Sequence, residues 1–258
     1  AMENSLESTC RRQLRISVSV GKSIIMVLAM ATATAAIPLD DPSLPNATFF
    51  ELTSAAPWIS RQETSAAPWG ARSGFGTATT TDAVLVMGGY SIPSGFGTAT
   101  TSTNLNDVWA TSDGGTTWNE LTNAAPWSIR LFFGTATTST GAVLVMGGVV
   151  NFAANDVWVT SDGGTTWEQL NNAPWSVRFS FGTATTATGA VLVMGGRTGS
   201  SPTFMDFNDV WVTNDGGTTW DELTSAAPWG VRSRFGTATT STAVLVMGGM
   251  YPANLYND

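Results

Sequence analysis

A set of short repeated strings is the feature that most constrains the fold of this chain. FGTATT begins at Phe75, Phe96, Phe133, Phe181 and Phe235, and AVLVMGG begins at Ala83, Ala142, Ala190 and Ala243. NDVW begins at Asn106, Asn155 and Asn208, and a DGGTTW segment follows it each time. Successive AVLVMGG strings lie 59, 48 and 53 residues apart. A period of roughly 50 residues is typical of β-propellers and is longer than that of most helical solenoids.

Each repeat unit predicts four short β-strands. FGTATT alternates larger and small residues before a turn signal, and AVLVMGG is a continuous apolar run of the kind found in strands buried on both faces. DVWVT and TTWEQL flank an Asp-Gly-Gly turn, a strong hairpin signal because glycine accepts a positive φ. No segment after Ile37 shows a helical apolar period. We therefore predict an all-β chain in which four-stranded antiparallel blades form a β-propeller.

The units predict about four blade equivalents. Complete units span about 72–123, 130–172 and 178–224, and a partial unit spans 232–258. Residues 49–53 match the fourth strand of a unit, so we expect them to complete the last blade and close the ring within a repeat region of 49–258. TSAAPW recurs after only 11 residues, and SGFGTATT recurs at Ser94. These irregularities leave two alternatives open, an incomplete ring and a ring that a homo-oligomer completes.

The first 36 residues have the pattern of a secretory signal peptide. Four basic residues within the first 22 precede a 13-residue apolar stretch, Ile24–Ala36, that ends in small residues. A membrane helix needs roughly 20 apolar residues. We expect residues 1–36 to direct export to the cell exterior or an organelle lumen and to leave no membrane span after removal; a signal anchor and a buried helix are the alternatives. Residues 37–48 form a linker, in which Asn46 begins an N-x-T glycosylation acceptor or a chance tripeptide.

The body after Ile37 lacks most residues that carry chemistry. It has no His, Lys or Cys, and it holds seven Arg against 17 Asp and Glu. These absences exclude Cys and His nucleophiles, Ser–His pairs, lysine Schiff bases and zinc sites with His or Cys ligands. An acidic body also excludes nucleic acid as a partner, because phosphate binding needs a basic face. We expect no cofactor and no metal, and only carboxylates remain for acid–base work.

The repeat resembles the kelch family of β-propellers. The shared marks are a glycine pair after the second strand, an aromatic residue in the third strand, a tryptophan in the fourth and a Pro-x-x-x-Arg segment before the first. The glycine pairs are Gly88–Gly89, Gly147–Gly148, Gly195–Gly196 and Gly248–Gly249, and the fourth-strand tryptophans are Trp118, Trp167 and Trp220. The resemblance covers about Phe49 to the C-terminus and implies that these residues are structural. The chain departs from it where a phenylalanine takes the place of a histidine that kelch units often carry.

The segment T-S-D-G-G-T-T-W also resembles the Asp-box of sialidases, sortilin-type receptors and photosystem II assembly factors. In those propellers the motif is a structural hairpin on the outer strands, distant from the ligand site. The resemblance implies that Asp113, Asp162 and Asp215 accept backbone hydrogen bonds within their turns. Calcium binding is the alternative, but one or two carboxylates make a poor site for an ion that takes six to eight oxygen ligands.

The loops between second and third strands form the candidate binding region. They share one face with the APWxxR connections and vary in length, whereas the opposite turns are short and nearly identical, so we expect recognition on the variable face. The candidate contact residues are Trp69, Trp127, Trp175, Trp229, Arg72, Arg130, Arg178, Arg232, Tyr90, Arg197 and Phe204. For the tryptophans and arginines that recur in every unit, packing between blades is the alternative.

These patterns favour an exported, non-catalytic binding or scaffold module that recognises a protein partner. A carbohydrate-binding propeller is the alternative, because the candidate face is rich in aromatic residues. A carboxylate-based glycosidase ranks third, because only carboxylates remain for acid–base work. A sialidase would also need a cluster of three arginines and a tyrosine nucleophile, and no tyrosine lies in a recognisable glycosidase context. The copper oxidases built on kelch propellers use Cys and His ligands that the body of this chain lacks.

Overall fold

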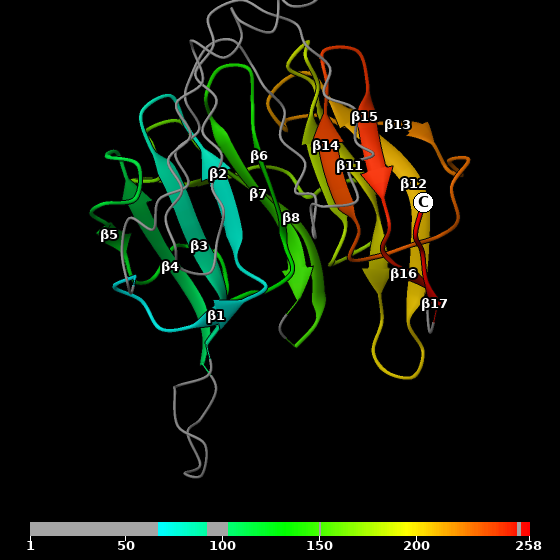
Figure 1. The fold of residues 1–258 in the computed structure, drawn as a ribbon, viewed down its shortest axis with the longest axis horizontal. Helices are drawn as coiled ribbons and strands as arrows, with labels where there is room; N and C mark the ends of the chain where they lie inside the picture. Colours follow the sequence, from blue (N-terminus) through cyan, green and yellow to red (C-terminus); the bar gives the residue numbers. More distant parts are fainter. Residues whose placement is uncertain (1–66, 92–102, 150, 252–253) are drawn as a thin grey trace, which may run out of the picture. The chain divides into compact units, whose positions relative to one another are not determined.

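β-Strands form where the repeated strings predict them. The computed structural model describes residues 67–91, 103–149, 151–251 and 254–258, which contain 17 strands and no helix. The described residues belong to one compact unit, Glu63–Asp258. No helix that could cross a membrane occurs among them. The prediction of an all-β fold is confirmed, and the strands join in antiparallel sheets arranged as propeller blades (Figure 1).

The first blade shows the pattern that the others repeat. Its strands are β1 (Arg72–Ser73), β2 (Gly76–Thr79), β3 (Val84–Ser91), β4 (Thr103–Thr111) and β5 (Asn119–Thr122). β2 pairs with β3, β3 with β4 and β4 with β5, so FGTATT forms one edge of the sheet and the segment after DGGTTW forms the other. β1 pairs with the far end of β3.

The second and third blades have the same four-stranded order, and the fourth is shorter. The second blade contains β6 (Gly134–Thr137), β7 (Val143–Val149), β8 (Ala153–Thr160) and β9 (Glu168–Gln169). The third contains β10 (Gly182–Thr185), β11 (Val191–Thr198), β12 (Met205–Thr213) and β13 (Asp221–Thr224). In the fourth, β14 (Gly236–Thr239) pairs with β15 (Val244–Met247), and β16 (Met250–Tyr251) pairs with β17 (Asn254–Leu255).

The glycine pair that ends AVLVMGG bends the second strand of each blade. Gly147 and Gly148 have φ angles of 56° and 96°, a region that glycine adopts far more readily than other residues. The register between β7 and β8 shifts between Met146 and Gly148, which marks a β-bulge. A Cβ atom on Gly148 would lie 2.7 Å from the Cβ of Phe133. The pair therefore allows both the bend and the close approach of the preceding segment.

Neighbouring blades meet along their FGTATT strands. The Thr135 hydroxyl donates to the Thr77 carbonyl at 2.7 Å, and the Thr183 hydroxyl donates to the Thr135 carbonyl at 2.7 Å. The phenylalanine of each string covers the glycine of the preceding blade, so that a Cβ atom on Gly76 would lie 2.5 Å from the Phe133 ring. Small residues in FGTATT therefore set the distance between blades.

Apolar clusters fill the space between successive blades. Between the first and second blades, Leu85, Met87 and Val108 pack with Trp127 and Val145, and all five are buried. Equivalent clusters join the second blade to the third and the third to the fourth. Burying a side chain of this kind contributes about 1.5–3 kcal/mol. Contact between blades thus provides much of the stability that an isolated hairpin lacks.

A chain of backbone hydrogen bonds also runs from blade to blade. Phe132 donates to the carbonyl of Gly74, Ser180 to that of Phe132 and Arg234 to that of Ser180, over 2.8, 2.8 and 2.9 Å. Phe132, Ser180 and Arg234 have positive φ angles of 56°, 54° and 56°. Such a backbone costs roughly 1–3 kcal/mol in a residue other than glycine. Its repetition at every junction shows that the contact between blades imposes it.

Several sequence predictions fall on other parts of the chain. The leader 1–36, the linker with Asn46, the closing strand 49–53 and the repeated string at Ser94 lie outside the described residues. Within the described part, three complete blades and the β14–β17 strands of a fourth are present.

Candidate binding face

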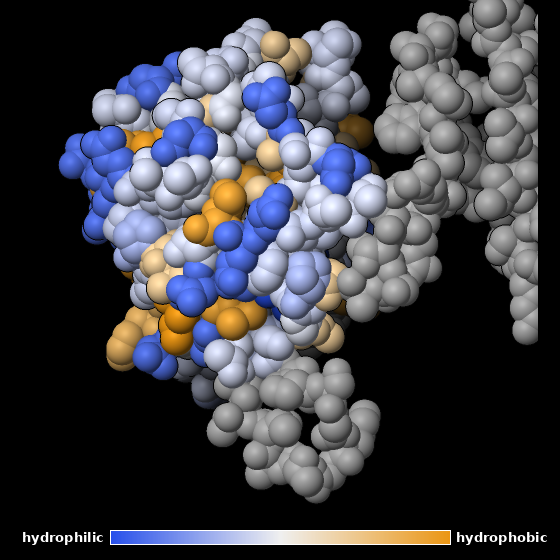
Figure 2. Space-filling model, turned by 90° about the vertical axis from the view of Figure 1, so that its left-hand side faces the viewer, coloured by the Kyte–Doolittle hydropathy of each residue, from blue (hydrophilic) through white to orange (hydrophobic). Residues whose placement is uncertain are grey.

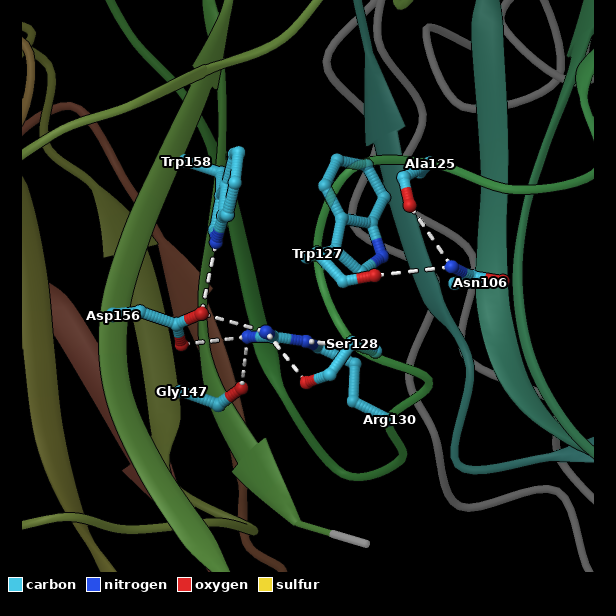
Figure 3. A network of polar contacts seen from close by, with 8 residues as sticks. All are labelled: Asn106, Ala125, Trp127, Ser128, Arg130, Gly147, Asp156 and Trp158. Atoms are coloured by element: carbon cyan, nitrogen blue, oxygen red, sulfur yellow. Dashed lines mark hydrogen bonds and ion pairs between the residues drawn. The ribbon is translucent and has the colours of Figure 1, made fainter.

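In the four APWxxR connections that the structure describes, the arginine forms an ion pair with an aspartate, which belongs to an NDVW string in the first three blades. Arg130 donates from Nη1 to Oδ1 of Asp156 at 2.8 Å and from Nη2 to Oδ2 at 2.6 Å (Figure 3). Nη1 also donates to the carbonyl of Gly147 at 2.7 Å, and the Trp158 indole donates to Asp156 at 2.8 Å. Burial acts to raise the pKa of Asp156, but the hydrogen bonds and charge of Arg130 outweigh it and lower that pKa.

The same pair recurs in all four blades. The equivalents are Arg72 with Asp107, Arg178 with Asp209 and Arg232 with Asp258. The hydrogen bond from Arg232 lowers the pKa of Asp258, and the same bond raises the pKa of Arg232. Sequence reasoning did not single out these aspartates. The signal that could have found them is one arginine and one aspartate at fixed places in every unit.

Arg130, Arg178 and Arg232 also join two blades through their backbones. Arg130 N–H donates to the Leu105 carbonyl at 3.3 Å, and the Arg130 carbonyl accepts from Gly89 N–H at 3.0 Å, so the backbone is held by the first blade. Its guanidinium is held by the second blade through Asp156. The arginine is therefore a clamp across the junction between the blades.

The tryptophan of APWxxR lies inside the same junction. Trp127 and Trp175 are only 1% and 2% exposed. The Trp127 ring packs against that of Trp167 with a centroid distance of 4.4 Å and an interplanar angle of 88°. Asn106 Nδ2 donates to the carbonyls of Ala125 and Trp127 at 2.9 and 3.0 Å (Figure 3). This asparagine fixes the connection from the preceding blade.

The Asp-Gly-Gly turns use their carboxylates internally. Asp162 accepts hydrogen bonds from the Thr166 hydroxyl at 2.6 Å and from its backbone N–H at 2.9 Å, and the Thr160 hydroxyl donates to it at 2.8 Å. The bonds from Thr166 lower the pKa of Asp162 to about 2, and the backbone N–H of Thr117 heads the causes that lower the pKa of Asp113 to about 2. Asp215 has the same partners through Thr219 and Thr213, and its pKa is also lowered.

The candidate residues in the long loops divide between the interior and the surface. Arg197 is buried and donates to Asp206 at 2.9 and 3.0 Å. Its guanidinium lies 4.7 Å from the centroid of the Phe204 ring, which is 37% exposed. Tyr90 is half-buried in β3, beside β1. Phe204 and, in part, Tyr90 are therefore the loop candidates that reach the surface.

The burial of the recurrent residues bears on the candidate contact surface. Trp127, Trp175, Arg130, Arg178 and Arg232 are buried, and Trp69, Trp229 and Arg72 are partly buried. The guanidinium groups of all four arginines are occupied by carboxylates. These side chains hold the blades together and leave little area for a partner.

Exposed apolar side chains gather instead on what we call the loop face, formed among the described residues by the β7–β8 and β11–β12 connections and the APWxxR segments. Phe152 in the β7–β8 connection is 87% exposed, and Met205 at the start of β12 is 61% exposed. Ile129 and Val177, from two APWxxR segments, are also exposed. Figure 2 shows the side of the molecule that carries the first blade, where hydrophobic patches lie among hydrophilic side chains, several of them near the lower end. Phe152 and Met205 were missed because nothing repeats at their positions.

A shallow hollow lies on this face at the second blade. It has a volume of about 340 Å³ and lies between the Ser128–Arg130 segment and the turn from β7 into β8. Ile129 and Phe152 contribute apolar side chains, and Ser128 and Asn151 contribute polar ones. A hollow of this size is at the small end of ligand sites.

The described residues thus define a propeller-like repeat protein with an internal set of ion-pair clamps and an apolar loop face. They contain no group of three or more His, Cys, Asp or Glu side chains placed to hold a metal ion. No family model matches the sequence, and no match is found among curated proteins.

Proposed function

We propose that this protein is an exported, non-catalytic binding or scaffold module that recognises a protein partner through its loop face. The observation that carries the proposal is the exposure of Phe152 and Phe204 in loops that differ between blades, and of Met205 at the start of β12, on a scaffold built of repeated strings. Apolar and aromatic side chains at the centre of a patch are the usual energetic anchors of protein interfaces.

The chemistry of the body supports binding over catalysis. Five of its aspartates are paired with arginines, and Asp113, Asp162 and Asp215 accept hydrogen bonds within turns. A carboxylate-based glycosidase needs two carboxyl groups that face a sugar ring. The exposed Asp221 and Glu222 lie on the outer strand β13, and no Asp or Glu lines the hollow on the loop face, so this candidate has the least support of the three.

The test is capture of a partner from the secreted or lumenal fraction of the source organism on immobilised protein. We expect Phe152→Ser and Met205→Ser each to weaken the captured interaction by about tenfold, since truncating an interface anchor typically costs more than about 1 kcal/mol. Leu223→Ser is the matched control, because Leu223 is also an exposed apolar residue but lies on the outer strand β13. Equal binding by all three variants would contradict a role for the loop face.

A carbohydrate-binding function is the second candidate, and the hollow at Phe152 favours it. An exposed aromatic ring beside Ser128 and Asn151 offers a stacking surface with hydrogen-bonding groups at its edge. A glycan array that detects binding, with the signal lost in Phe152→Ala and retained in Leu223→Ser, would replace the protein-partner proposal. A silent array would remove this candidate.

A further inference from the structure

The two ends of the blade series expose the two halves of one interface. The contact between the first and second blades recurs between the second and third and between the third and fourth. Each contact joins the side of one blade that we call its tail face to the side of the next blade that we call its head face. At the first contact, Leu85 and Met87 lie on the tail face of the first blade, and Val143 and Val145 lie on the head face of the second. The first blade has a head face, and the fourth blade a tail face, that no described residue covers.

Several apolar groups of these two faces are exposed where their equivalents are buried. Leu245 and Met247 of the fourth blade are 45% and 44% exposed, whereas the matching Leu144 and Met146 of the second blade are fully buried. On the first blade, Phe75 is 43% exposed, whereas the matching Phe133 is 9% exposed. The residues exposed at one end of the series thus match those on one side of an internal contact, and the residue exposed at the other end matches one on the opposite side.

The shape of the two faces is complementary at the Phe–Gly contact. Phe133, Phe181 and Phe235 each cover the glycine of the preceding blade, so closely that no Cβ atom fits on Gly76, Gly134 or Gly182. A Cβ atom built on the fourth glycine in the series, Gly236, would have its nearest neighbour among the described residues, the Met247 carbonyl oxygen, at 3.9 Å. Among the described residues, therefore, no phenylalanine covers Gly236, and Phe75 covers no glycine of another blade.

The polar groups of the two faces are complementary in the same order. At the three internal junctions, Gly89, Gly148 and Gly196 donate their N–H to the carbonyls of Arg130, Arg178 and Arg232. The matching Gly249 N–H has no acceptor among the residues that the structure describes. Likewise the Thr135, Thr183 and Thr237 hydroxyls donate to the preceding blade, whereas that of Thr77 has no acceptor there.

We propose that the tail face of one copy of this chain binds the head face of a second copy. In the associated state Phe75 of one copy lies over Gly236 of the other, Gly249 N–H donates to the Arg72 carbonyl, and the Thr77 hydroxyl donates to the Thr237 carbonyl. Such a contact is heterologous, so it continues into a larger ring or a filament or closes between two copies. It uses the ends of the series and is independent of the loop face.

The test is sedimentation of the full chain over a wide range of concentrations. We expect the mass to rise with concentration above that of the monomer. Gly236→Val places a side chain where Phe75 of the second copy would pack, and valine is compatible with a β-strand. We therefore expect this variant to remain folded and to associate at least about tenfold more weakly. Phe75→Ala removes the matching group at the other end and should have a similar effect, and adding Phe75→Ala to Gly236→Val should restore part of the association.

Phe152→Ser is the control, because it alters the loop face and neither end of the series; its association should equal that of the original chain. A monomer at every concentration overturns the proposal, whether or not Gly236→Val lowers its stability. A fall in stability would mean that the chain's own residues cover the face. Association that Gly236→Val and Phe75→Ala leave unchanged also overturns the proposal, since the leader or another surface would then cause it. None of these results bears on capture of a partner by the loop face.

Discussion

At the scale of single residues, the clamp arginines explain why this fold keeps a charge at each junction. One guanidinium satisfies a carbonyl and both oxygens of a carboxylate, as Arg178 does with Gly195 and Asp209 over 2.6–2.8 Å. A lysine ammonium cannot make this planar, forked contact. The pairing escaped sequence analysis because Arg178 and Asp209 are 31 residues apart and meet only when the blade has formed.

We predict that Arg178→Met lowers the free energy of unfolding by about 3–5 kcal/mol, because it leaves the carboxylate of Asp209 buried without its partner. Urea unfolding followed by tryptophan fluorescence measures the change. If Arg178→Met does not fold, Arg178→Lys serves as the second variant, and we expect it to be less stable than the original chain as well. Arg234→Met is the matched control, since Arg234 is exposed and pairs with no carboxylate among the described residues. It should change stability by no more than about 0.5 kcal/mol. Equal effects at the two positions would contradict the clamp.

The turn aspartates predict a loss of stability in acid. The pKa of Asp162 is lowered to about 2 in the folded chain, so its carboxylate stabilises the fold above about pH 4, the ordinary range of an aspartate. This contribution is lost as the pH falls from about 4 through 2. We predict that Asp162→Asn is less stable than the original chain by about 1 kcal/mol at pH 7, the net value of a hydrogen bond, and that the difference disappears near pH 2.

Unfolding by urea at a series of pH values measures this difference. Asp221→Asn is the control, because the side chain of Asp221 is exposed and has no hydrogen bond to a described residue. Its difference from the original chain should stay near zero at every pH. A constant difference for Asp162→Asn from neutral to acid would show that the carboxylate charge is not what stabilises the turn.

At the scale of elements, the FGTATT strand combines a role in its own sheet with a role between blades. The sequence was sufficient to predict the strand, since its alternation and its terminal turn signal are local properties. The hydroxyl bonds to the neighbouring blade could not be predicted in this way, because Thr183 and Thr135 belong to different units. The same limit applied to the candidate binding residues. A tryptophan and an arginine that recur in every unit can belong to a contact surface or to a buried junction between blades, and the sequence alone does not distinguish the two.

We predict that Thr183→Val lowers the free energy of unfolding by about 1 kcal/mol, because it leaves the Thr135 carbonyl without its 2.7 Å donor while conserving the shape of the side chain. Thr77→Val is the matched control, since Thr77 occupies the equivalent place in β2 and its hydroxyl has no acceptor among the described residues. At low protein concentration this control should be neutral within about 0.5 kcal/mol. Equal losses from both variants would mean that the hydroxyl bond between blades contributes nothing.

At the scale of the whole molecule, nearest-neighbour contacts make each blade depend on the blades beside it. The repeat period and the turn signals were sufficient to predict blades of four antiparallel strands. They could not predict which side chains the ends of the series leave uncovered, because AVLVMGG has the same sequence in every blade. Position in the series, rather than sequence, decides whether Leu144 or Leu245 is buried.

This dependence predicts that identical strands differ in hydrogen exchange. β7 and β15 share the string AVLVMGG, so their amides have nearly equal intrinsic exchange rates. Blades cover β7 on both sides, whereas Leu245 and Met247 of β15 are nearly half exposed. We therefore expect β15 amides to exchange at least about tenfold faster than those of β7 at low protein concentration, because local opening exposes less buried surface there. Mass spectrometry of peptides that extend into the distinct flanking residues separates the two strands. Equal protection at every dilution would mean that the end blade is as well covered as an internal one.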